Sequence, residues 1–108
     1  MDTHRTCSIP VNVWVDKGIA SLVVALNRYP QIVTYESCEN GTDGQAFVSF
    51  SVTDEESLVP TVETIAQRLA GSDLPAVVAL EWWYGATTPG AVIRCSPDAV
   101  DAVALRLS

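Results

Sequence analysis

Three segments of this chain carry apolar residues at the spacing of one helix face, and two pairs of strand-like runs lie between them. Within each segment the apolar positions recur at i, i+3, i+4 and i+7, so a helix there has a single apolar stripe. The stripes are Ile19, Leu22, Val23 and Leu26, then Val62, Ile65, Ala66 and Leu69, then Val100, Val103, Ala104 and Leu107. The spacing therefore predicts three amphipathic helices, each of which needs an apolar surface to cover.

The second of these helices has two candidate starts. One is Asp54, whose side-chain oxygen can cap the helix. A helix that begins there also has the carboxylates of Glu55 and Glu56 near its positive end. Pro60 follows within two turns and is expected to break the helix or to restart it as the first residue of the main segment.

Between the helices the sequence predicts four strands in two hairpins. Each hairpin has two runs with strand-like composition on either side of a glycine-bearing loop. The expected strands are 31–37 and 46–52 around the loop 38–45, then 76–84 and 91–95 around the loop 85–90. Residues 9–15 read as extended and could add an edge strand.

Hairpins pair their strands antiparallel, and the helices need a sheet face to cover. We therefore expect an α+β fold in a single two-layer domain over residues 1–108, a length that can bury a working core. It has a mostly antiparallel sheet of four or five strands and three helices, in the order helix, hairpin, helix, hairpin, helix. We expect residues 1–8 to be flexible.

Alternation along the expected strands divides their side chains between two faces. One face is apolar and is expected to lie under the helices: Ala46, Val48, Phe50, Val52, Val78, Leu80, Trp82, Tyr84, Ala91, Ile93 and Cys95. The opposite face is mixed and carries Phe47, Ser49, Ser51, Glu81, Trp83, Val92 and Arg94. Aromatic rings beside an acidic and a basic side chain suit an open ligand platform or the contact surface of a homodimer.

The formal net charge of −7 argues against two classes of partner. Duplex nucleic acid is held mainly by Lys and Arg on its phosphates, and the six basic residues of this chain are scattered. We therefore expect neither duplex nucleic acid nor an anionic membrane as a partner, whereas a local RNA contact or a basic protein partner stays open. No apolar run approaches the roughly 20 residues of a membrane span, and no signal peptide is evident, so we expect a cytoplasmic location.

The densest group of reactive and polar side chains lies where the strand 31–37 passes into the loop that follows it. This group consists of Glu36, Ser37, Cys38, Glu39, Asn40 and Asp43. Cys38 is a candidate nucleophile, because a nearby cation, histidine or helix N-terminus can stabilise a thiolate at a strand end. Its acidic neighbours oppose thiolate formation, and an inert thiol that packs as a small apolar group is the competing interpretation.

Metal and cofactor signals are weak. The widely spaced Cys7, Cys38 and Cys95, with His4 as the single histidine, lack the spacing of a zinc site. Gly41 and Gly44 are not followed by the lysine of a phosphate-binding loop. We therefore expect neither a metal nor a cofactor, and we expect the loop residues to form a binding pocket. The expected ligand-binding residues are Glu36, Ser37, Cys38, Glu39, Asn40, Asp43, Glu81, Trp83 and Arg94.

Part of the first half carries a short motif. The motif residues are Val15-Asp16, Leu22-Val23, Leu26-Asn27 and the run Thr34 to Cys38. This region, about Val13 to Phe50, resembles the start of the tRNA wybutosine-synthesising methyltransferase family, in which a similar helix precedes a strand that ends in a Ser-Ser-Cys-Ser-Gly-Arg type motif. Ser37 and Cys38 match its Ser-Cys, and Asp16 and Asn27 match upstream positions. Glu36 and Glu39 replace the two flanking serines, and Asn40-Gly41 stands where Gly-Arg is expected.

The resemblance implies a related fold and a related pocket. Members of that family use S-adenosylmethionine to methylate a modified guanosine in tRNA. Three functional hypotheses follow from the sequence. The leading one is a small acidic, non-enzymatic binding domain for an unknown small molecule or protein. The alternatives are a reduced relative of an S-adenosylmethionine-dependent tRNA or nucleoside methyltransferase, and a homo-oligomeric structural module.

Overall fold

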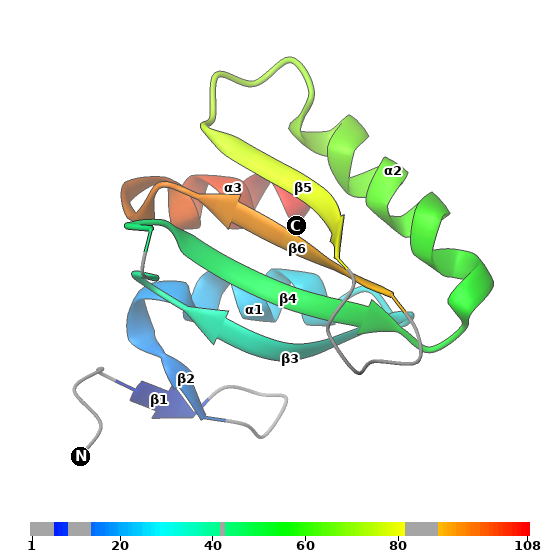
Figure 1. Ribbon diagram of the computed structural model, residues 1–108. Coiled ribbons are helices and arrows are strands. Elements are labelled where there is room, and N and C mark those ends of the chain that lie inside the picture. Colours follow the sequence, from blue (N-terminus) through cyan, green and yellow to red (C-terminus); the bar gives the residue numbers. More distant parts are fainter. Residues whose placement is uncertain (1–5, 9–13, 42, 82–88) are drawn as a thin grey trace.

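The computed structural model describes residues 6–8, 14–41, 43–81 and 89–108. Within these ranges the chain forms a four-stranded antiparallel sheet, three α-helices and a separate two-stranded sheet (Figure 1). The strands of the larger sheet are β3 (Ile32–Cys38), β4 (Ala46–Val52), β5 (Ala76–Glu81) and β6 (Gly90–Cys95). The helices are α1 (Ala20–Asn27), α2 (Leu58–Leu69) and α3 (Val100–Leu107), and each follows a 3-10 turn, at Lys17–Ile19, Glu55–Ser57 and Pro97–Ala99.

The element order confirms the predicted α+β fold and the alternation of helices with strand pairs. The strands lie in the spatial order β3-β4-β6-β5, and every neighbouring pair is antiparallel. The second strand of each expected hairpin, β4 and β6, is therefore central, while β3 and β5 are the edges of this sheet.

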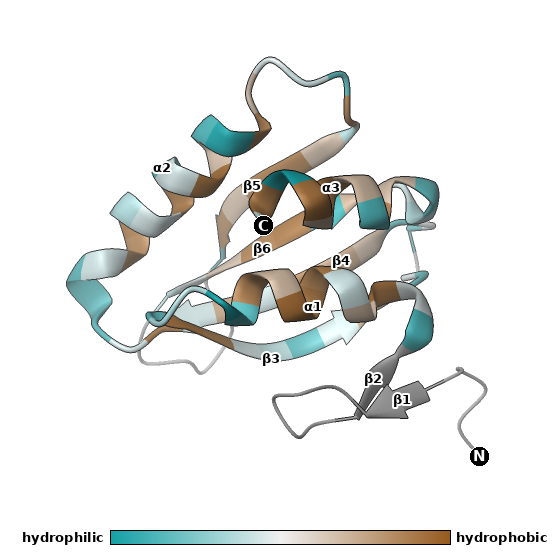
Figure 2. Ribbon diagram, turned by 180° about the vertical axis from the view of Figure 1, so that it is seen from behind, coloured by the Kyte–Doolittle hydropathy of each residue, from teal (hydrophilic) through white to brown (hydrophobic). Residues whose placement is uncertain are grey.

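The helices are distributed unevenly around the sheet. Figure 2 shows α1 and α3 side by side across one face, and α2 lies beside the edge strand β5. In Figure 1 the opposite face is turned toward the viewer, and α1 and α3 lie behind the sheet. The two-stranded sheet of β1 (Thr6–Ser8) and β2 (Trp14–Asp16) lies apart from the main sheet. Residues 1–5 of the segment expected to be flexible, and residues 9–13 of the expected edge strand, lie outside the described residues.

The core lies between the sheet and the helices α1 and α3, and α2 adds Leu58 and Ile65 to it. The central strands contribute side chains that are fully buried: Ala46, Val48, Phe50, Ala91, Ile93 and Cys95. The predicted stripes of the first and third helices are all buried as well. Burial of each large apolar side chain contributes about 1.5–3 kcal/mol, so this single layer of contacts holds the fold together.

Two side chains expected in the core are exposed. Ala66 of α2 faces solvent, and the buried residues of that helix are Leu58, Thr61 and Ile65. The Thr61 hydroxyl accepts a hydrogen bond from the Gln31 side chain at 3.3 Å. Leu80 is 55% exposed, because it lies one residue from the end of the edge strand β5, which has a strand neighbour on one side only. The other two residues expected on this side at the end of the strand, Trp82 and Tyr84, lie outside the described residues.

The start of α2 also differs from the expectation. Asp54 caps the 3-10 turn, since its side chain accepts a hydrogen bond from the backbone N–H of Glu56 at 3.2 Å. Pro60 is the third residue of α2, not the first. The backbone N–H groups of a first helical turn have no partner within the helix, so a proline there neither breaks nor restarts it.

The backbone and side chains around Gly90 leave no room for a larger residue. A Cβ atom at this position would lie 2.7 Å from the carbonyl oxygen of Phe50 and 2.9 Å from the hydroxyl oxygen of Tyr35. The Phe50 carbonyl belongs to the central strand β4 and cannot move without disturbing the sheet. We expect Gly90→Ala to lower the free energy of unfolding by about 1–3 kcal/mol, as overpacking does, with the m-value unchanged in urea denaturation. Adding Tyr35→Phe should recover only part of the loss, because the Phe50 contact remains. A stability equal to that of the wild type would contradict this packing.

Candidate functional site

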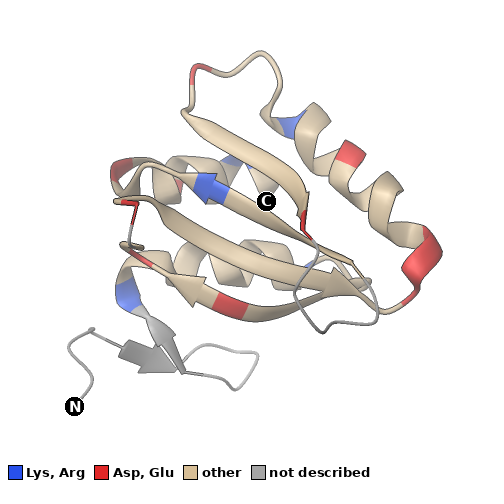
Figure 3. Ribbon diagram, in the orientation of Figure 1, with Lys and Arg blue, Asp and Glu red and all other residues tan. Residues whose placement is uncertain are grey.

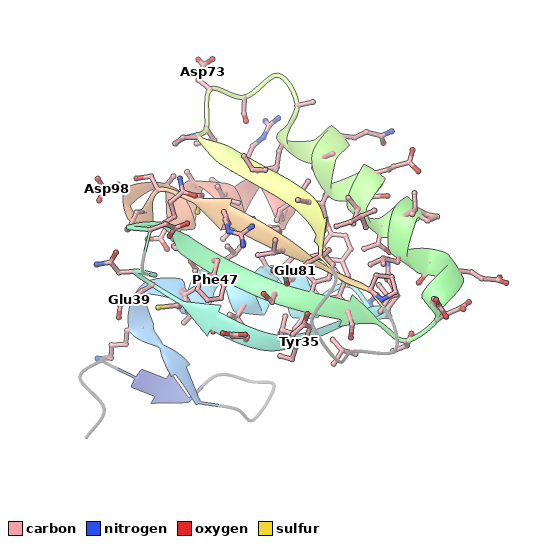
Figure 4. All side chains as sticks on the ribbon, viewed as in Figure 1. Tyr35, Glu39, Phe47, Asp73, Glu81 and Asp98 are labelled. Carbon is pink, nitrogen blue, oxygen red and sulfur yellow. The ribbon has the colours of Figure 1, made fainter. Side chains whose placement is uncertain are left out.

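The face of the main sheet that is turned away from α1 and α3 brings together polar and aromatic side chains from all four strands. We call it the exposed sheet face and define it by Val33, Tyr35, Glu36, Phe47, Ser49, Val77, Glu81 and Arg94. Strand register places Phe47, Arg94 and Val77 in one row across β4, β6 and β5. Figure 4 shows the side chains of Tyr35, Phe47 and Glu81 over the side of the sheet that faces the viewer.

A β-bulge in β3 decides which side chains of that strand reach this face. Thr34 pairs with Phe50 and Glu36 pairs with Ser49, so the strand register shifts by one residue at Tyr35. Bulges re-aim the side chains that follow them. Without this shift, strict alternation from Thr34 would send Glu36 toward the helices. With it, Glu36 shares a face with Ser49, and Cys38 shares a face with Phe47.

Glu81 is the centre of the polar contacts on the exposed sheet face. One of its carboxylate oxygens, Oε2, accepts a hydrogen bond from Ser49 Oγ at 3.2 Å. Its other oxygen, Oε1, lies 3.7 Å from Arg94 Nη2. The hydroxyl donor is on a residue that is only 2% exposed, whereas the Arg94 side chain is 41% exposed. The Glu81 carboxylate is therefore held by a hydrogen bond from the buried Ser49 hydroxyl and has a longer ion-pair contact with the more exposed Arg94 guanidinium.

A shallow hollow of about 210 Å³ lies over these groups and is lined by Glu36, Phe47, Ser49, Glu81 and Arg94. Glu36 is exposed, and no hydrogen bond or ion pair joins it to any residue that the structure describes. Arg94 has five N–H donors, and its contact with Glu81, at 3.7 Å, is an ion pair longer than a hydrogen bond. The hollow thus offers a free carboxylate, unused guanidinium donors and an aromatic ring.

The structure brings Glu36, Glu81 and Arg94 together in this hollow, places Cys38 beside Phe47 on the same face, and locates Ser37, Glu39, Asn40 and Asp43 elsewhere. Glu39 lies at one end of the molecule, in a second hollow of about 260 Å³ that it shares with Lys17, Gly18, Pro97, Asp98, Val100 and Asp101. Its side chain lies directly against Gly18, where any Cβ atom would collide with it. Asp43 accepts a hydrogen bond from the backbone N–H of Gln45 at 3.0 Å and so stabilises its own turn.

Besides Cys38, the remaining expected residues are Ser37, Asn40 and Trp83. Ser37 pairs with Val48 on the helix-facing side of the sheet and is half-buried, and Asn40 is exposed in the turn between β3 and β4. Trp83, the aromatic expected on the mixed face, lies outside the described residues.

The two cysteines that the structure describes differ in their surroundings. Cys38 is half-buried beside Phe47 at the end of β3. Cys95 is buried in the core, and this burial raises the pKa of its thiol above the ordinary value. Within the described ranges, no group of three or more His, Cys, Asp or Glu side chains is placed to hold a metal ion.

The residues of the exposed sheet face that were not predicted as site residues from the sequence are Val33, Tyr35, Phe47, Ser49 and Val77. Alternation along the strand did assign Phe47 and Ser49 to the mixed face, so their position was available from the sequence. Tyr35 sits at the bulge, and nothing in the local sequence marks a bulge there. Val77 reads as one more apolar residue of a strand, but it is 61% exposed.

A third hollow, of about 400 Å³, lies between α1 and α3 on the opposite side of the molecule. Small and apolar side chains form most of it, including Ala20, Val24 and Leu105. Its closest polar contact joins Ser21 Oγ to Asp101 Oδ1 at 2.6 Å. Leu105 is the most exposed large apolar residue of the described part of the chain, at 76%.

Comparisons with protein-family models, with curated proteins and with solved structures found no match for this chain. None of the helices that the structure describes has the length and the apolar content to cross a membrane. The function must therefore be argued from the geometry of the residues themselves.

The contrast between the two cysteines is testable in a Cys7→Ser background, which removes the third thiol. We expect Cys38 to react with a thiol reagent in the native protein at pH 7. Cys95 should react only after unfolding, because its thiol is buried and its raised pKa keeps it protonated. Mass spectrometry after timed labelling, with and without urea, measures both rates. Equal native-state rates would contradict the burial of Cys95.

Proposed function

We propose that this protein is a small, non-catalytic binding domain and that its exposed sheet face is the surface that holds a protein partner. The observation that carries the proposal is the composition of that face. Apolar side chains that are about half exposed, among them Val33, Tyr35 and Val77, surround the polar centre of Ser49, Glu81 and Arg94. Exposed apolar side chains together with a few placed polar groups are typical of protein interaction sites.

The shape of the face favours a protein over a small molecule. Small-molecule sites are usually concave, with volumes of about 300–1,000 Å³, and they enclose most of the ligand. The hollow on the exposed sheet face is about 210 Å³, and the apolar side chains lie around it and not over it. A broad partner surface can cover Val33 and Val77 together, whereas a small ligand in the hollow would leave both in water.

The arrangement of polar groups favours binding over catalysis. Ser49 is buried, so although its hydroxyl donates to the Glu81 carboxylate, its oxygen is not accessible to a substrate as a nucleophile would have to be. Glu81 is held in turn by Ser49 and Arg94. Its carboxylate, held by one hydrogen bond and one ion pair, can serve as an acceptor for a partner.

A different protein fits this face better than a second copy of the chain. Each copy carries a net charge of −7, so two copies repel each other as they approach. A homodimer through the exposed sheet face is nevertheless a distinct outcome that light scattering detects directly.

The proposal can be tested with a random peptide library displayed on phage and selected on the wild-type protein. We expect the selected peptides to lose binding to Val77→Glu, which places a charge among the exposed apolar side chains. They should keep binding to Leu105→Glu, a matched change on the opposite side of the molecule. Titration calorimetry gives the dissociation constants, for which we expect a loss of at least tenfold for the first variant and less than twofold for the second.

Circular dichroism and urea midpoints establish that both variants fold, which is expected because both positions are exposed. Equal binding by Val77→Glu and the wild type would place the binding surface elsewhere. If the wild-type protein selects no peptide and stays monomeric, the proposal that this face holds a protein partner is wrong.

The resemblance to wybutosine-synthesising methyltransferases supports a second proposal, that the chain binds S-adenosylmethionine. The supporting observation is that two residues of the resembling segment are joined, since Asn27 Nδ2 donates to Thr34 Oγ1 at 3.0 Å. The helix and the strand of the motif are thus held together as one unit.

Bound S-adenosylmethionine would raise the thermal midpoint of unfolding. A ligand at about 100 times its dissociation constant adds about 2.7 kcal/mol to the free energy of unfolding. Differential scanning fluorimetry with S-adenosylmethionine, and with adenosine as the control, measures the shift. An unchanged midpoint at saturating S-adenosylmethionine would remove this proposal and would leave the binding proposal untouched.

A further inference from the structure

We infer that the exposed sheet face recognises a cationic side chain, Lys or Arg, of a basic protein partner, and that Glu36 is the carboxylate that pairs with it. This inference rests on the proposed function, because it specifies what the binding surface reads. Three features of the hollow support it: an uncompensated charge, the aromatic ring beside that charge, and the sign of the charge on the whole chain.

The first feature is the charge balance of the hollow. Two carboxylates, Glu36 and Glu81, line it together with one guanidinium, that of Arg94. Arg94 contacts Glu81, which lies on β5, whereas Glu36 lies on β3 at the opposite edge of the sheet. Glu36 has no ion-pair partner among the described residues. One negative charge of the hollow is therefore left for a partner.

The position of Glu36 lets its carboxylate stay hydrated in the unbound protein. Its side chain is exposed at the edge strand β3, so the carboxylate keeps its hydration until a partner arrives. Its neighbour across the strand pair is Ser49, whose hydroxyl already donates to Glu81. Ser49 is thus unavailable to Glu36 as a donor, and an incoming ammonium or guanidinium group can take that role.

The second feature is Phe47, which lines the same hollow as Glu36. A cation that pairs with Glu36 from above the sheet approaches this ring. A Lys or Arg side chain within about 6 Å of an aromatic ring gains about 0.5–1 kcal/mol at an exposed site. The combination of a carboxylate with an aromatic ring favours a long cationic side chain, whose apolar stem can cover the ring while its charged end reaches the carboxylate.

The third feature is the long-range field. Figure 3 shows one basic position on the main sheet, on β6, and acidic positions on β3 and at the end of β5. Across the whole sequence, 13 acidic residues outnumber six basic ones. Such a surface attracts basic proteins during diffusion and repels acidic ones, so the association rate is expected to fall as the salt concentration rises.

An anionic group is the alternative ligand, since Arg94 has unused donors. It would have to approach Arg94 past Glu81 and Glu36, against the charge of the whole chain. A carboxylate partner therefore meets two repulsive charges for each attractive one, whereas a cation meets the reverse.

The test uses the phage-selected peptides and two variants of the full chain, Glu36→Gln and Glu63→Gln. Glu63 is an exposed carboxylate of α2, so its variant removes the same charge away from the exposed sheet face. We expect the selected peptides to share a Lys or Arg. Glu36→Gln should weaken their binding about fivefold, as expected for one partly exposed ion pair, and Glu63→Gln less than twofold.

A double-mutant cycle identifies the pair directly. Replacing the shared Arg of the peptide by citrulline, which keeps the shape and removes the charge, should cost about fivefold on the wild-type protein. On Glu36→Gln the same replacement should cost less than twofold, since the charge it pairs with is already absent. Equal losses on both proteins would overturn the role of Glu36.

The outcomes separate this inference from the proposed function. If the peptides bind at the exposed sheet face, as judged by Val77→Glu, but share no basic residue, the cationic partner is wrong and the binding surface stands. If binding is insensitive to Val77→Glu, the binding surface itself is wrong. A wild-type dimer that Val77→Glu dissociates would assign the face to a second copy and overturn the basic partner.

Discussion

The packing of β4 and β6 against α1 and α3 is the constraint on which the rest of the molecule depends. These strands are central in the sheet, and their inward side chains, such as Phe50 and Ile93, are fully buried beneath the two helices. Because the core lies on one side of the sheet, the side chains between those inward ones must point away from it. The exposed sheet face is thus a geometric consequence of the core, and its composition is free to serve another purpose.

The bulge at Tyr35 adds a carboxylate, that of Glu36, to the polar groups of that face. It shifts β3 by one residue, so Glu36 and not Tyr35 pairs with Ser49. Tyr35 itself reaches across the sheet to Gly90, where the missing side chain leaves room for its hydroxyl. A larger residue at position 90 and a regular strand at position 35 would each remove part of the arrangement. The arrangement of Tyr35 and Glu36 therefore depends on both Gly90 and the bulge.

Much of the fold could be predicted from the sequence, because helical and strand periodicities report directly which side chains are buried. The stripes of α1 and α3 and the inward residues of β4 and β6 are all where alternation places them. The failures have local causes. Ala66 and Leu80 are apolar in sequence but lie where no neighbour covers them. The site was harder to predict, since the bulge that moves Glu36 to the exposed sheet face depends on pairing with β4 and leaves no local signal.

The burial of Ser49 explains how a charged centre can persist on this face. A carboxylate beside an apolar surface loses part of its hydration, and the Ser49 hydroxyl and the Arg94 guanidinium replace what Glu81 loses. Glu36 receives no such replacement from the residues that the structure describes, and it stays exposed. The two carboxylates of one hollow therefore have different tasks. Glu81 belongs to the architecture of the face, and Glu36 keeps the one charge that a partner can still neutralise.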